Sequence, residues 1–491
     1  MFLNKIYSMI LGIGEVQRQS IAAFLSQISF TMMGFFSTMY FAHTVGASIL
    51  GGYFLFIAYY GIINMITDGG LGGAAIKRIS EGDEQNAYFT TFFVLRCLFV
   101  TIVISLLIAF RESFIEFNEA GTFNWLILAL LVSLFHGLVT NGISGNGKVG
   151  IYAVSNFMNN ASRIAIQVIG IFLGYGVAGL TGGFIAGLLV STVIALRFLD
   201  LGFSPFKWVH IKRLTAFSFW LFLTSTGVLL YSQTDTIMIG YFMDNFDVGV
   251  YRVVFQFTTL ATIATTAFRL TLWPKVSKWS KKDENGLIEE SLSKACTYSL
   301  TIAIPIFAGG ILLGDQLLYF FYGQDFASGY YTFVILLFVQ IVNIYQFFFT
   351  MYLGAQDRQK DSFKVTAAAA ITNVLLNFIL IPIIGILGAA IATLFTMGLN
   401  ALLARKILSK MITIKIEYDS LLNTLKAATV MALLIGVYRA IIPLSNIWIT
   451  LIPVFLGGAT YSILVLKFDH KINEELKGIL GQMNIPWPSW L

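Results

Sequence analysis

Charged residues and cysteines are both scarce in this chain of 491 residues. Only 11% of its residues are charged, whereas an ordinary soluble domain has about 25%. Its two cysteines, Cys97 and Cys296, lie in apolar segments without a CxxC pair, and its four histidines lack metal-ligand spacing. These absences argue against a disulfide framework and a zinc site. No GxxxxGK[ST] loop is available to bind nucleotide phosphates. The sequence therefore predicts no cofactor and no metal.

Long apolar runs are what the sequence has instead. Hydrophobic residues make up 57% of the chain, and the mean hydropathy is +0.80. A helix needs about 20 residues to cross the hydrocarbon core of a membrane. Runs of about that length fall at 16–43, 50–76, 87–110, 122–144, 149–174, 176–198, 214–242, 248–273, 292–313, 329–353, 363–384, 386–408, 421–442 and 446–466. The sequence predicts an all-α polytopic membrane protein with about 14 transmembrane helices.

Basic residues are distributed unequally between alternate loops. Both termini and every second loop hold most of the 31 basic residues, whereas the other loops hold only Arg111, Arg252 and Arg439. Loops rich in Lys and Arg stay on the cytoplasmic side. We therefore expect a multi-pass protein of the cell (inner) membrane with both termini in the cytoplasm. The net charge of +6 is spread over short loops beside the lipid bilayer, so no nucleic-acid partner is predicted.

A sequence pattern recurs after 209 residues. Gly145-Asn-Gly-Lys, a helix and Gly176-Val-Ala-Gly179 return as Gly354-Ala-Gln-Asp, a helix and Gly385-Ile-Leu-Gly388. A looser match links Gly52-Tyr53 to Gly249-Val-Tyr251. The repeat predicts two copies of a six-helix unit, which run in the same sense because six is an even number.

The repeat also predicts how the chain divides into domains. We expect an N-terminal six-helix lobe at 1–200, a second six-helix lobe at 201–410, and helices 13 and 14 with a cytoplasmic tail at 411–491. Parallel repeats of this kind usually place a binding cavity between the lobes and work by rocking. A central cavity between the two lobes is therefore predicted.

One predicted helix, at 149–174, carries a polar face. The residues that share this face are Asn156, Asn159, Asn160, Arg163 and Gln167. Arg163 lies about 14 residues into the helix, roughly 21 Å from its cytoplasmic start at about 1.5 Å per residue, which is too deep for it to extend back to the headgroups. An arginine at that depth needs water or a partner. It either faces a hydrated cavity or pairs with a buried carboxylate such as Asp68, and both alternatives are open.

Two more arginines and two asparagines complete the predicted substrate-binding set. Arg96 and Arg269 lie within predicted spans, although each can alternatively extend to the cytoplasmic headgroups. Asn373 and Asn377 share a face of the helix at 363–384. Arginine binds phosphate through paired hydrogen bonds, and amide groups suit sugar hydroxyls. Such a lining favours a polar anionic headgroup over a hydrophobic cation.

Two carboxylates lie well inside the predicted spans and are candidates for coupling to H⁺ or Na⁺. Asp68 shares a helix face with Asn64 and Tyr60, whose oxygens can complete the shell of an ion. Asp235 is expected near the outer end of its helix. Each carboxylate either binds an ion or neutralises an arginine. We expect Asp68 to be the better coupling candidate.

The order and spacing of several motifs resemble the polysaccharide transporter branch of the multidrug/oligosaccharidyl-lipid/polysaccharide (MOP) exporter superfamily, the Wzx-type O-antigen flippases. The motifs include Gly145-Asn-Gly-Lys, Gly174-Tyr-Gly-Val-Ala-Gly-Leu, Asp235-Thr-Ile-Met-Ile-Gly-Tyr-Phe, Tyr322-Gly-Gln-Asp-Phe and Asn373-Val-Leu-Leu-Asn-Phe-Ile-Leu-Ile-Pro. The resemblance implies a flippase that moves polyprenyl-diphosphate-linked oligosaccharide units from the cytoplasmic to the outer leaflet by alternating access. It also implies that Arg163 and Arg96 meet the diphosphate-sugar.

Two other functions compete with this one. A MATE-like multidrug or cation antiporter has the same architecture and differs in whether acidic or basic residues dominate the cavity. A membrane polymerase or ligase needs catalytic groups outside the membrane, usually on a large external loop, whereas the outer loops here are short. The chain is therefore not expected to be an enzyme. A flippase of this kind would have polysaccharide-assembly proteins as partners.

Overall fold

The computed structural model describes residues 15–113, 117, 121–482 and 487. The first 14 residues and most of the last nine, which carry the two predicted cytoplasmic termini, lie outside the described residues. In the described part of the chain every element of regular secondary structure is a helix, and no strand occurs there. Apolar segments form helices in a membrane because their backbone N–H and C=O groups can be paired only within the segment.

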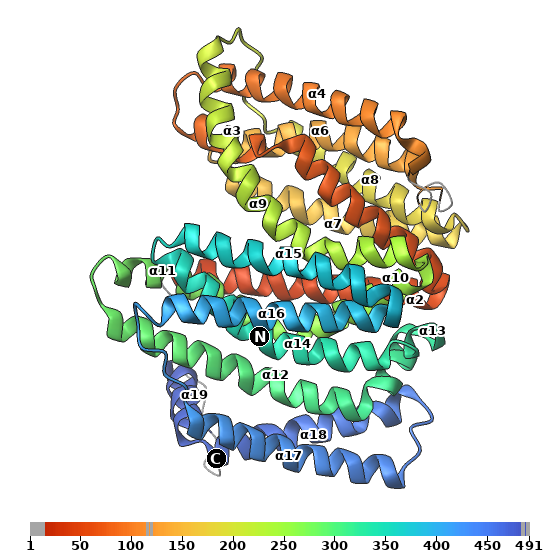
Figure 1. Ribbon diagram of the computed structural model, residues 1–491, viewed down its shortest axis with the longest axis vertical. Coiled ribbons are helices and arrows are strands. Elements are labelled where there is room, and N and C mark those ends of the chain that lie inside the picture. Colours follow the sequence, from red (N-terminus) through yellow and green to blue (C-terminus); the bar gives the residue numbers. More distant parts are fainter. Residues whose placement is uncertain (1–14, 114–116, 118–120, 483–486, 488–491) are drawn as a thin grey trace, which may run out of the picture. The chain divides into compact units, whose positions relative to one another are not determined.

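Most of the helices are long enough to cross a bilayer (Figure 1). In chain order they are α2 (Glu15–Asp68), α3 (Leu71–Ser80), α4 (Gln85–Ala109), η1 (Arg111–Ser113), α6 (Phe123–Gly145), α7 (Val149–Phe172), α8 (Gly176–Leu196), α9 (Trp208–Phe242), α10 (Asn245–Thr258), η2 (Thr259–Thr262), α11 (Ile263–Ser280), α12 (Asn285–Tyr322), α13 (Gln324–Ala327), α14 (Tyr330–Ala355), α15 (Gln359–Ile384), α16 (Ile386–Leu408), α17 (Tyr418–Ile441), α18 (Ile447–Phe468) and α19 (His470–Gln482).

The predicted spans all fall on these helices. Among the described residues, 11 helices are long and apolar enough to cross a membrane. One of them, α2, contains the first predicted span and most of the second, and the two meet at a kink where Gly46 has φ 74° and ψ 179°. The polar face of α7 lowers its hydropathy and keeps it out of the 11. The chain is a multi-pass, all-α membrane protein, as the sequence predicts.

Some predicted spans are interrupted. The second span breaks at Gly69 and Gly70, whose φ angles of 54° and 76° end α2 and allow α3 to begin. The eighth span consists of α10, the short helix η2 and α11. Gly176 and Gly385, which correspond in the sequence repeat, both have a positive φ, of 51° and 63°. The two copies of the repeat therefore use the same left-handed turn between their paired helices.

The helices pack into two compact units. Unit 2 comprises Phe41–Arg252 and Val374–Ile386. Within it, α4, α6, α7 and α8 lie alongside one another (Figure 1), and α9 packs on α3 and α4. Its tightest backbone approach joins α2 to α10, where a Cβ on Gly51 would lie 1.6 Å from the carbonyl oxygen of Asn245. Small residues permit such close approaches between membrane helices.

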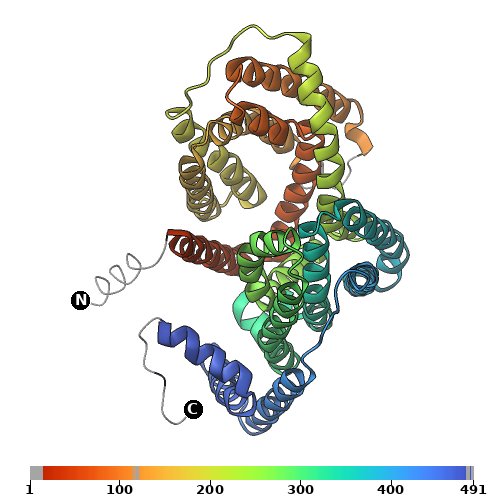
Figure 2. The same cartoon turned by 90° about the vertical axis from the view of Figure 1, so that its left-hand side faces the viewer.

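Unit 1 comprises the residues up to Tyr40, Val253–Asn373 and those from Leu387 onward. Its core is built around α12, which packs on α11, α14, α17 and α18. The three last helices, α17, α18 and α19, are grouped together in blue in Figure 2. The two units are defined by which helices pack together, whereas the lobes predicted at 1–200 and 201–410 are defined by the sequence repeat. The two lobes therefore remain a prediction.

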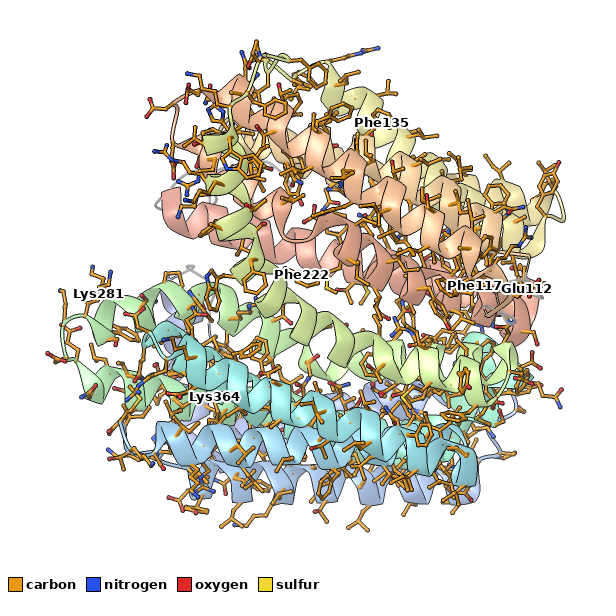
Figure 3. All side chains as sticks on the ribbon, turned by 45° about the horizontal axis from the view of Figure 1, so that its top comes forward. Glu112, Phe117, Phe135, Phe222, Lys281 and Lys364 are labelled. Carbon is orange, nitrogen blue, oxygen red and sulfur yellow. The ribbon has the colours of Figure 1, made fainter. Side chains whose placement is uncertain are left out.

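Charge and apolar surface are separated along the helices. Lys281 and Lys364 of unit 1 lie at the same end of its helices (Figure 3), and we call this the basic end. Apolar side chains face outward between the helix ends. Phe135 of α6, for example, points away from the helix bundle and is 55% exposed (Figure 3). This exposed apolar surface is what a protein embedded in lipid requires.

Candidate functional site

Asp68 and Arg96 form an ion pair inside unit 2, in which the arginine is buried and the side chain of the aspartate is 24% exposed. The Arg96 Nη1 atom donates to the Asp68 Oδ1 atom at 2.6 Å. The Arg96 Nη2 atom donates to the Asn64 side-chain oxygen at 3.2 Å and to the Ser133 carbonyl oxygen at 3.3 Å. Arg96 is 4% exposed. The guanidinium is therefore held by α2 and α6 and does not extend to the headgroups.

Glycines make room for this pair. A Cβ on Gly137 of α6 would lie 2.4 Å from the Arg96 Nη1 atom, so the guanidinium rests directly on the α6 backbone. The Gly72 N–H donates to the second Asp68 oxygen at 3.2 Å. Ser133 donates its hydroxyl to Asn64 at 2.9 Å. The carboxylate and the guanidinium thus have fixed positions.

The ion pair corrects two alternatives left open by the sequence. The partner of Asp68 is Arg96 and not Arg163, and Arg96 does not act as a headgroup anchor. The predicted polar face of α2 is real, because Asn64 and Asp68 both contact the same guanidinium and Tyr60 lies beside Ser133 and Arg96. The sequence could not supply this pairing, because it does not show which arginine-bearing helix packs against α2.

The polar face of α7 is directed partly at α8. Gln167 is 2% exposed and donates its amide to the Leu180 carbonyl oxygen at 2.8 Å. A Cβ on Gly187 would lie 2.8 Å from the Cβ of Arg163 and 2.9 Å from the Asn159 side-chain oxygen. Gln167 is therefore a packing residue of the α7–α8 hairpin. Asn159 approaches α8 with its amide oxygen, whereas Arg163 approaches α8 with its Cβ.

Arg163 has no carboxylate partner among the described residues. It is half-buried, it makes no ion pair within the described part of the chain, and its buried Nε atom has no hydrogen-bond partner there. Asn160 donates to the Asn156 carbonyl oxygen at 2.9 Å, and Asn156 itself is exposed. An arginine within a membrane helix that lacks a carboxylate is a candidate for binding an anion.

A second carboxylate site joins α9, α10 and α15. The Tyr251 hydroxyl donates to one oxygen of Asp235 at 2.6 Å, and the Asn377 amide donates to the other at 2.6 Å. The exposed fractions of Asp235, Tyr251 and Asn377 are 7%, 1% and 0%. The predicted residues Asp235 and Asn377 therefore meet. Asp235 is buried by its protein neighbours although it lies near the C-terminal end of α9.

Sequence reasoning missed Tyr251 and Arg252 as neighbours of Asp235. The loop pattern of the sequence places Arg252 outside the membrane helices, but it lies in α10. Its guanidinium is 5.7 Å from the centre of the Phe54 ring and interacts electrostatically with Asp235. The repeat did contain a signal, because Gly249-Val-Tyr251 was matched to Gly52-Tyr53. The repeat therefore singled out the position of Tyr251, but it did not show that Tyr251 contacts Asp235.

The remaining predicted binding residues lie in unit 1. Asn373 is 1% exposed and donates its amide to the Thr396 hydroxyl of α16 at 3.5 Å. Arg269 is exposed, and its guanidinium lies 5.7 Å from the centre of the Phe347 ring. No group of three or more His, Cys, Asp or Glu residues that could hold a metal ion occurs in the part of the chain that was described.

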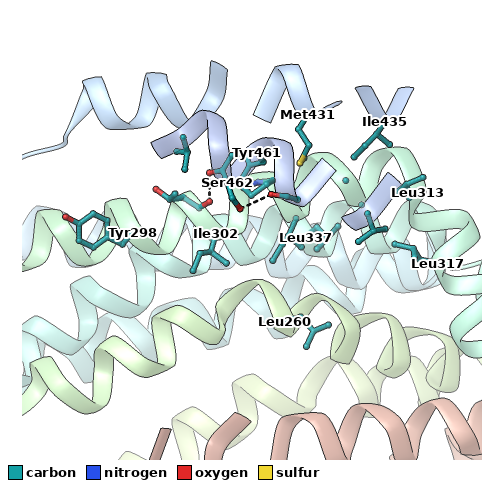
Figure 4. Close-up of a pocket in the computed structure, with 18 of the residues that line it drawn as sticks. Leu260, Tyr298, Ile302, Leu313, Leu317, Leu337, Met431, Ile435, Tyr461 and Ser462 are labelled. Atoms are coloured by element: carbon teal, nitrogen blue, oxygen red, sulfur yellow. Dashed lines mark hydrogen bonds between the residues drawn. The ribbon is translucent and has the colours of Figure 1, made fainter. Parts of the chain in front are cut away.

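A cavity of about 760 Å³ lies in unit 1 between α12, α14, α17, α18 and α19 (Figure 4). Its walls are mainly apolar, with Ile302, Leu337 and Met431 among the residues that line it. At one end, Tyr298 donates to Glu475, and Lys294 lies 2.6 Å from the same carboxylate. Its volume is within the range of about 300–1,000 Å³ of typical ligand pockets. The cavity suits an apolar chain.

Comparison with known proteins gives a family and a set of relatives. A family model described as "Polysaccharide biosynthesis protein" matches residues 41–330. The chain is 26% identical over 455 residues to a Haloferax volcanii protein named "Probable low-salt glycan biosynthesis flippase Agl15", and the match covers 93% of this chain and 96% of that protein.

Solved structures show the same fold. The chain resembles "Lipid II flippase MurJ, inward closed conformation" with a TM-score of 0.76 and 18% identity, over 91% of this chain and 98% of the other. It resembles an inward-facing multidrug resistance MATE family transporter of the MOP superfamily with a TM-score of 0.64 and 15% identity, over 78% and 95% of the two chains. These likenesses confirm the predicted membrane fold.

Proposed function

Because the chain belongs to the polysaccharide biosynthesis protein family, we propose that it is a flippase for polyprenyl-diphosphate-linked oligosaccharides. It moves them from the cytoplasmic to the outer leaflet by alternating access. The observation that carries this proposal is Arg163, a half-buried arginine in a membrane helix that makes no ion pair with the described residues. The relative's name, that of a glycan biosynthesis flippase, supports it. That name also agrees with the expectation that the chain is not an enzyme.

Arg163 is the proposed binding group for the diphosphate. A guanidinium offers paired N–H donors that match phosphate oxygens. Asn159 and Asn160 stand one turn before it on α7 and present amides for sugar hydroxyls or phosphate oxygens. Arg96 is proposed as a positioning residue, because both of its terminal nitrogens already donate to Asp68, Asn64 and the α6 backbone.

The apolar part of such a substrate needs an apolar surface. The 760 Å³ cavity of unit 1 provides one, because its lining is almost entirely hydrocarbon. A polyprenyl chain is longer than this cavity, so we propose that only a segment of the chain enters it. The rest of the chain stays in lipid.

Asp235 is the proposed coupling site for H⁺ or Na⁺, in place of Asp68. A ligand can drive the cycle only if it binds the two states differently. Asp68 is held by a guanidinium at 2.6 Å, which leaves little reason for it to bind a second cation. Tyr251 donates to Asp235 through its hydroxyl and Asn377 donates through its amide, and the oxygens of both side chains can turn toward a cation.

The orientation in the membrane follows from the basic loops. We propose that the basic end faces the cytoplasm and that both termini lie there, in the cell (inner) membrane. On this proposal the polysaccharide-assembly proteins that supply the lipid-linked glycan approach from the basic end.

Reconstituted vesicles test the function. A fluorescently labelled polyprenyl-diphosphate oligosaccharide is placed in one leaflet, and its arrival in the other is measured by accessibility to a membrane-impermeant quencher. Arg163→Ala should slow transport by about tenfold or more, the effect of losing one charge-assisted hydrogen bond, and Arg163→Lys should slow it less.

Arg197→Ala is the matched control, because Arg197 is exposed at the end of the same helical hairpin. Its transport should equal that of the wild type. Wild-type transport by Arg163→Ala would contradict the proposal. Gradient-driven efflux of a hydrophobic cation, without movement of the glycan lipid, would favour the MATE-like alternative.

A further inference from the structure

A second cavity in unit 1, of about 390 Å³, lies between α12, α14, α16 and α17. Apolar side chains such as Leu300, Phe338 and Ile341 line its interior. Its volume is within the range of about 300–1,000 Å³ found for ligand pockets. The proposed transport reaction does not use it.

The mouth of this cavity is cationic. Arg405, in the last turn of α16, and Lys415, in the segment that follows α16, both line it. Lys415 lies 3.6 Å from Glu289, and Glu417, also at the mouth, lies 3.5 Å from Lys471. These charges are therefore compensated within the protein.

Arg405 is the exception at the mouth. It makes no ion pair with any residue that the structure describes, and it is exposed. Its guanidinium is available to an anion from outside the chain. The Tyr345 hydroxyl and the Thr297 hydroxyl also line the cavity and offer further polar contacts.

The mouth lies where lipid headgroups would be. The α12 residues that line the cavity begin at Leu292, two turns after the start of that helix. Arg405 lies at the end of α16, and the Thr413 N–H beyond it donates to Glu289 of α12 at 2.7 Å. Both helix termini belong to the basic end, which also carries Lys281 (Figure 3). Basic residues at this level attract anionic lipids.

The two cavities of unit 1 differ in the charge at their polar ends. The carboxylate of Glu475 lines the larger cavity, and Lys294 and Tyr298 compensate it. In the smaller cavity the carboxylate of Glu417 is compensated by Lys471, and the Arg405 guanidinium makes no ion pair with any described residue. An anionic headgroup therefore fits the smaller cavity and not the larger one.

We propose that the smaller cavity binds an anionic phospholipid from the leaflet at the basic end. One apolar chain of the lipid lies between α12, α14, α16 and α17, and its phosphate accepts hydrogen bonds from Arg405. The bound lipid connects α16 to α12 and stabilises unit 1. This site is separate from that of the transported glycan, so its test does not depend on transport.

Arg405→Gln and Lys406→Gln form a matched pair for the headgroup. Both remove one positive charge from the last turn of α16, but Lys406 does not line the cavity. Binding of phosphatidylglycerol and of phosphatidylcholine to the full-length protein is measured by native mass spectrometry. The wild type should prefer phosphatidylglycerol, Arg405→Gln should bind it about tenfold more weakly, and Lys406→Gln should bind it as the wild type does.

Gly398→Phe and Gly436→Phe form a matched pair for the apolar chain. A Cβ on either glycine meets no atom within 4 Å, but only Gly398 lines the cavity. Gly398→Phe should fill the cavity, abolish binding of both lipids at this site and remove the thermal stabilisation that phosphatidylglycerol gives. Gly436→Phe should leave both unchanged.

Three results would overturn the proposal. One is equal binding of the two lipids by the wild type, and another is the same loss of binding in Lys406→Gln as in Arg405→Gln. The third is tighter binding of undecaprenyl phosphate than of phosphatidylglycerol in this cavity, which would assign it to the chain of the substrate. If Gly398→Phe does not fold, the comparison of Arg405→Gln with Lys406→Gln decides the matter.

Discussion

Asp68 and Asp235 are both carboxylates within membrane-spanning helices of unit 2, and they are held in different ways. Asp68 faces the guanidinium of Arg96 at 2.6 Å. Asp235 accepts hydrogen bonds from the hydroxyl of Tyr251 and the amide of Asn377. The first arrangement compensates a charge permanently. The second leaves the carboxylate among groups that can donate to it or, once reoriented, bind a cation with it.

This comparison separates a structural role from a coupling role. A carboxylate and a guanidinium with fixed partners connect α2, α4 and α6. Removing the carboxylate leaves the guanidinium charge buried, and removing the guanidinium leaves an unpaired carboxylate that is only 24% exposed. A carboxylate with hydroxyl and amide partners tolerates a change in its own charge, because the same partners can bond to either form. Four experiments would break or sharpen this distinction.

The largest effect is expected from Arg96→Met. It leaves Asp68 without its cation and should lower the free energy of unfolding by about 3–5 kcal/mol, measured by detergent-induced unfolding of the purified protein. The double variant Asp68→Asn with Arg96→Met should recover most of that loss, because no unpaired charge remains. A double variant as unstable as Arg96→Met alone would contradict the structural role of the pair.

A smaller effect is expected from Tyr251→Phe. The substitution removes the hydroxyl that donates to Asp235 at 2.6 Å, and a hydrogen bond to a charged group contributes about 1.5–3 kcal/mol. The same unfolding measurement should show a loss in that range. Tyr241→Phe is the control, since Tyr241 is 67% exposed at the end of α9. An equal loss of unfolding free energy in Tyr251→Phe and Tyr241→Phe would contradict a specific contribution of the Tyr251 hydroxyl.

Asp235→Asn should change the free energy of unfolding by less than about 1 kcal/mol, because an amide can still bond to Tyr251 and Asn377. Asp68→Asn alone should destabilise the protein more, since it leaves the Arg96 guanidinium buried without its carboxylate. The pair of variants is compared by thermal unfolding at one pH. A larger destabilisation by Asp235→Asn than by Asp68→Asn would contradict the different roles given to the two carboxylates.

The smallest effect concerns Glu84, a carboxylate outside the membrane-spanning helices. The Lys207 N–H donates to the His210 Nδ1 atom at 2.8 Å, so the neutral ring carries its proton on Nε2 and donates it to Glu84 at 2.9 Å. This hydrogen bond lowers the pKa of Glu84 below its ordinary value. A lowered pKa in the folded state gives stability that is present above about pH 4 and is lost as the pH falls further.

Glu84→Gln tests that sign. The wild type should be slightly more stable than Glu84→Gln at neutral pH, and the difference in unfolding temperature should shrink as the pH falls through the lowered pKa of Glu84. If the difference in unfolding temperature between the wild type and Glu84→Gln grows as the pH falls, the pKa of Glu84 is not lowered in the folded protein.

The helices could be predicted from the sequence, but the side-chain partners of Asp68 and Asp235 could not. Helices are local, because each apolar run satisfies its own backbone, and so all predicted spans appear in the structure. The partner of Asp68 depends on how α2, α4 and α6 pack. Gly137 permits that contact by leaving space for the Arg96 guanidinium, and no spacing rule in the sequence reports such a space.

The polar face of α7 teaches the same lesson. Periodicity correctly placed Arg163 and Gln167 on one face, but it could not distinguish a residue that packs from one that remains available. Gln167 bonds to the Leu180 carbonyl oxygen because Gly183 lets α7 and α8 approach closely. Likewise, the hydrogen bond from Tyr251 to Asp235 was not predicted, although Tyr251 belongs to the sequence repeat.

The most direct test of the account measures how glycan-lipid transport depends on an ion gradient in reconstituted vesicles. Three proteins are compared: the wild type, Asp235→Asn, and the double variant Asp68→Asn with Arg96→Met. We predict that an H⁺ or Na⁺ gradient accelerates transport by the wild type and the double variant, and that Asp235→Asn folds but does not respond to either gradient. Retention of the full gradient response by Asp235→Asn, with loss of that response in a folded double variant, would contradict the assignment of coupling to Asp235.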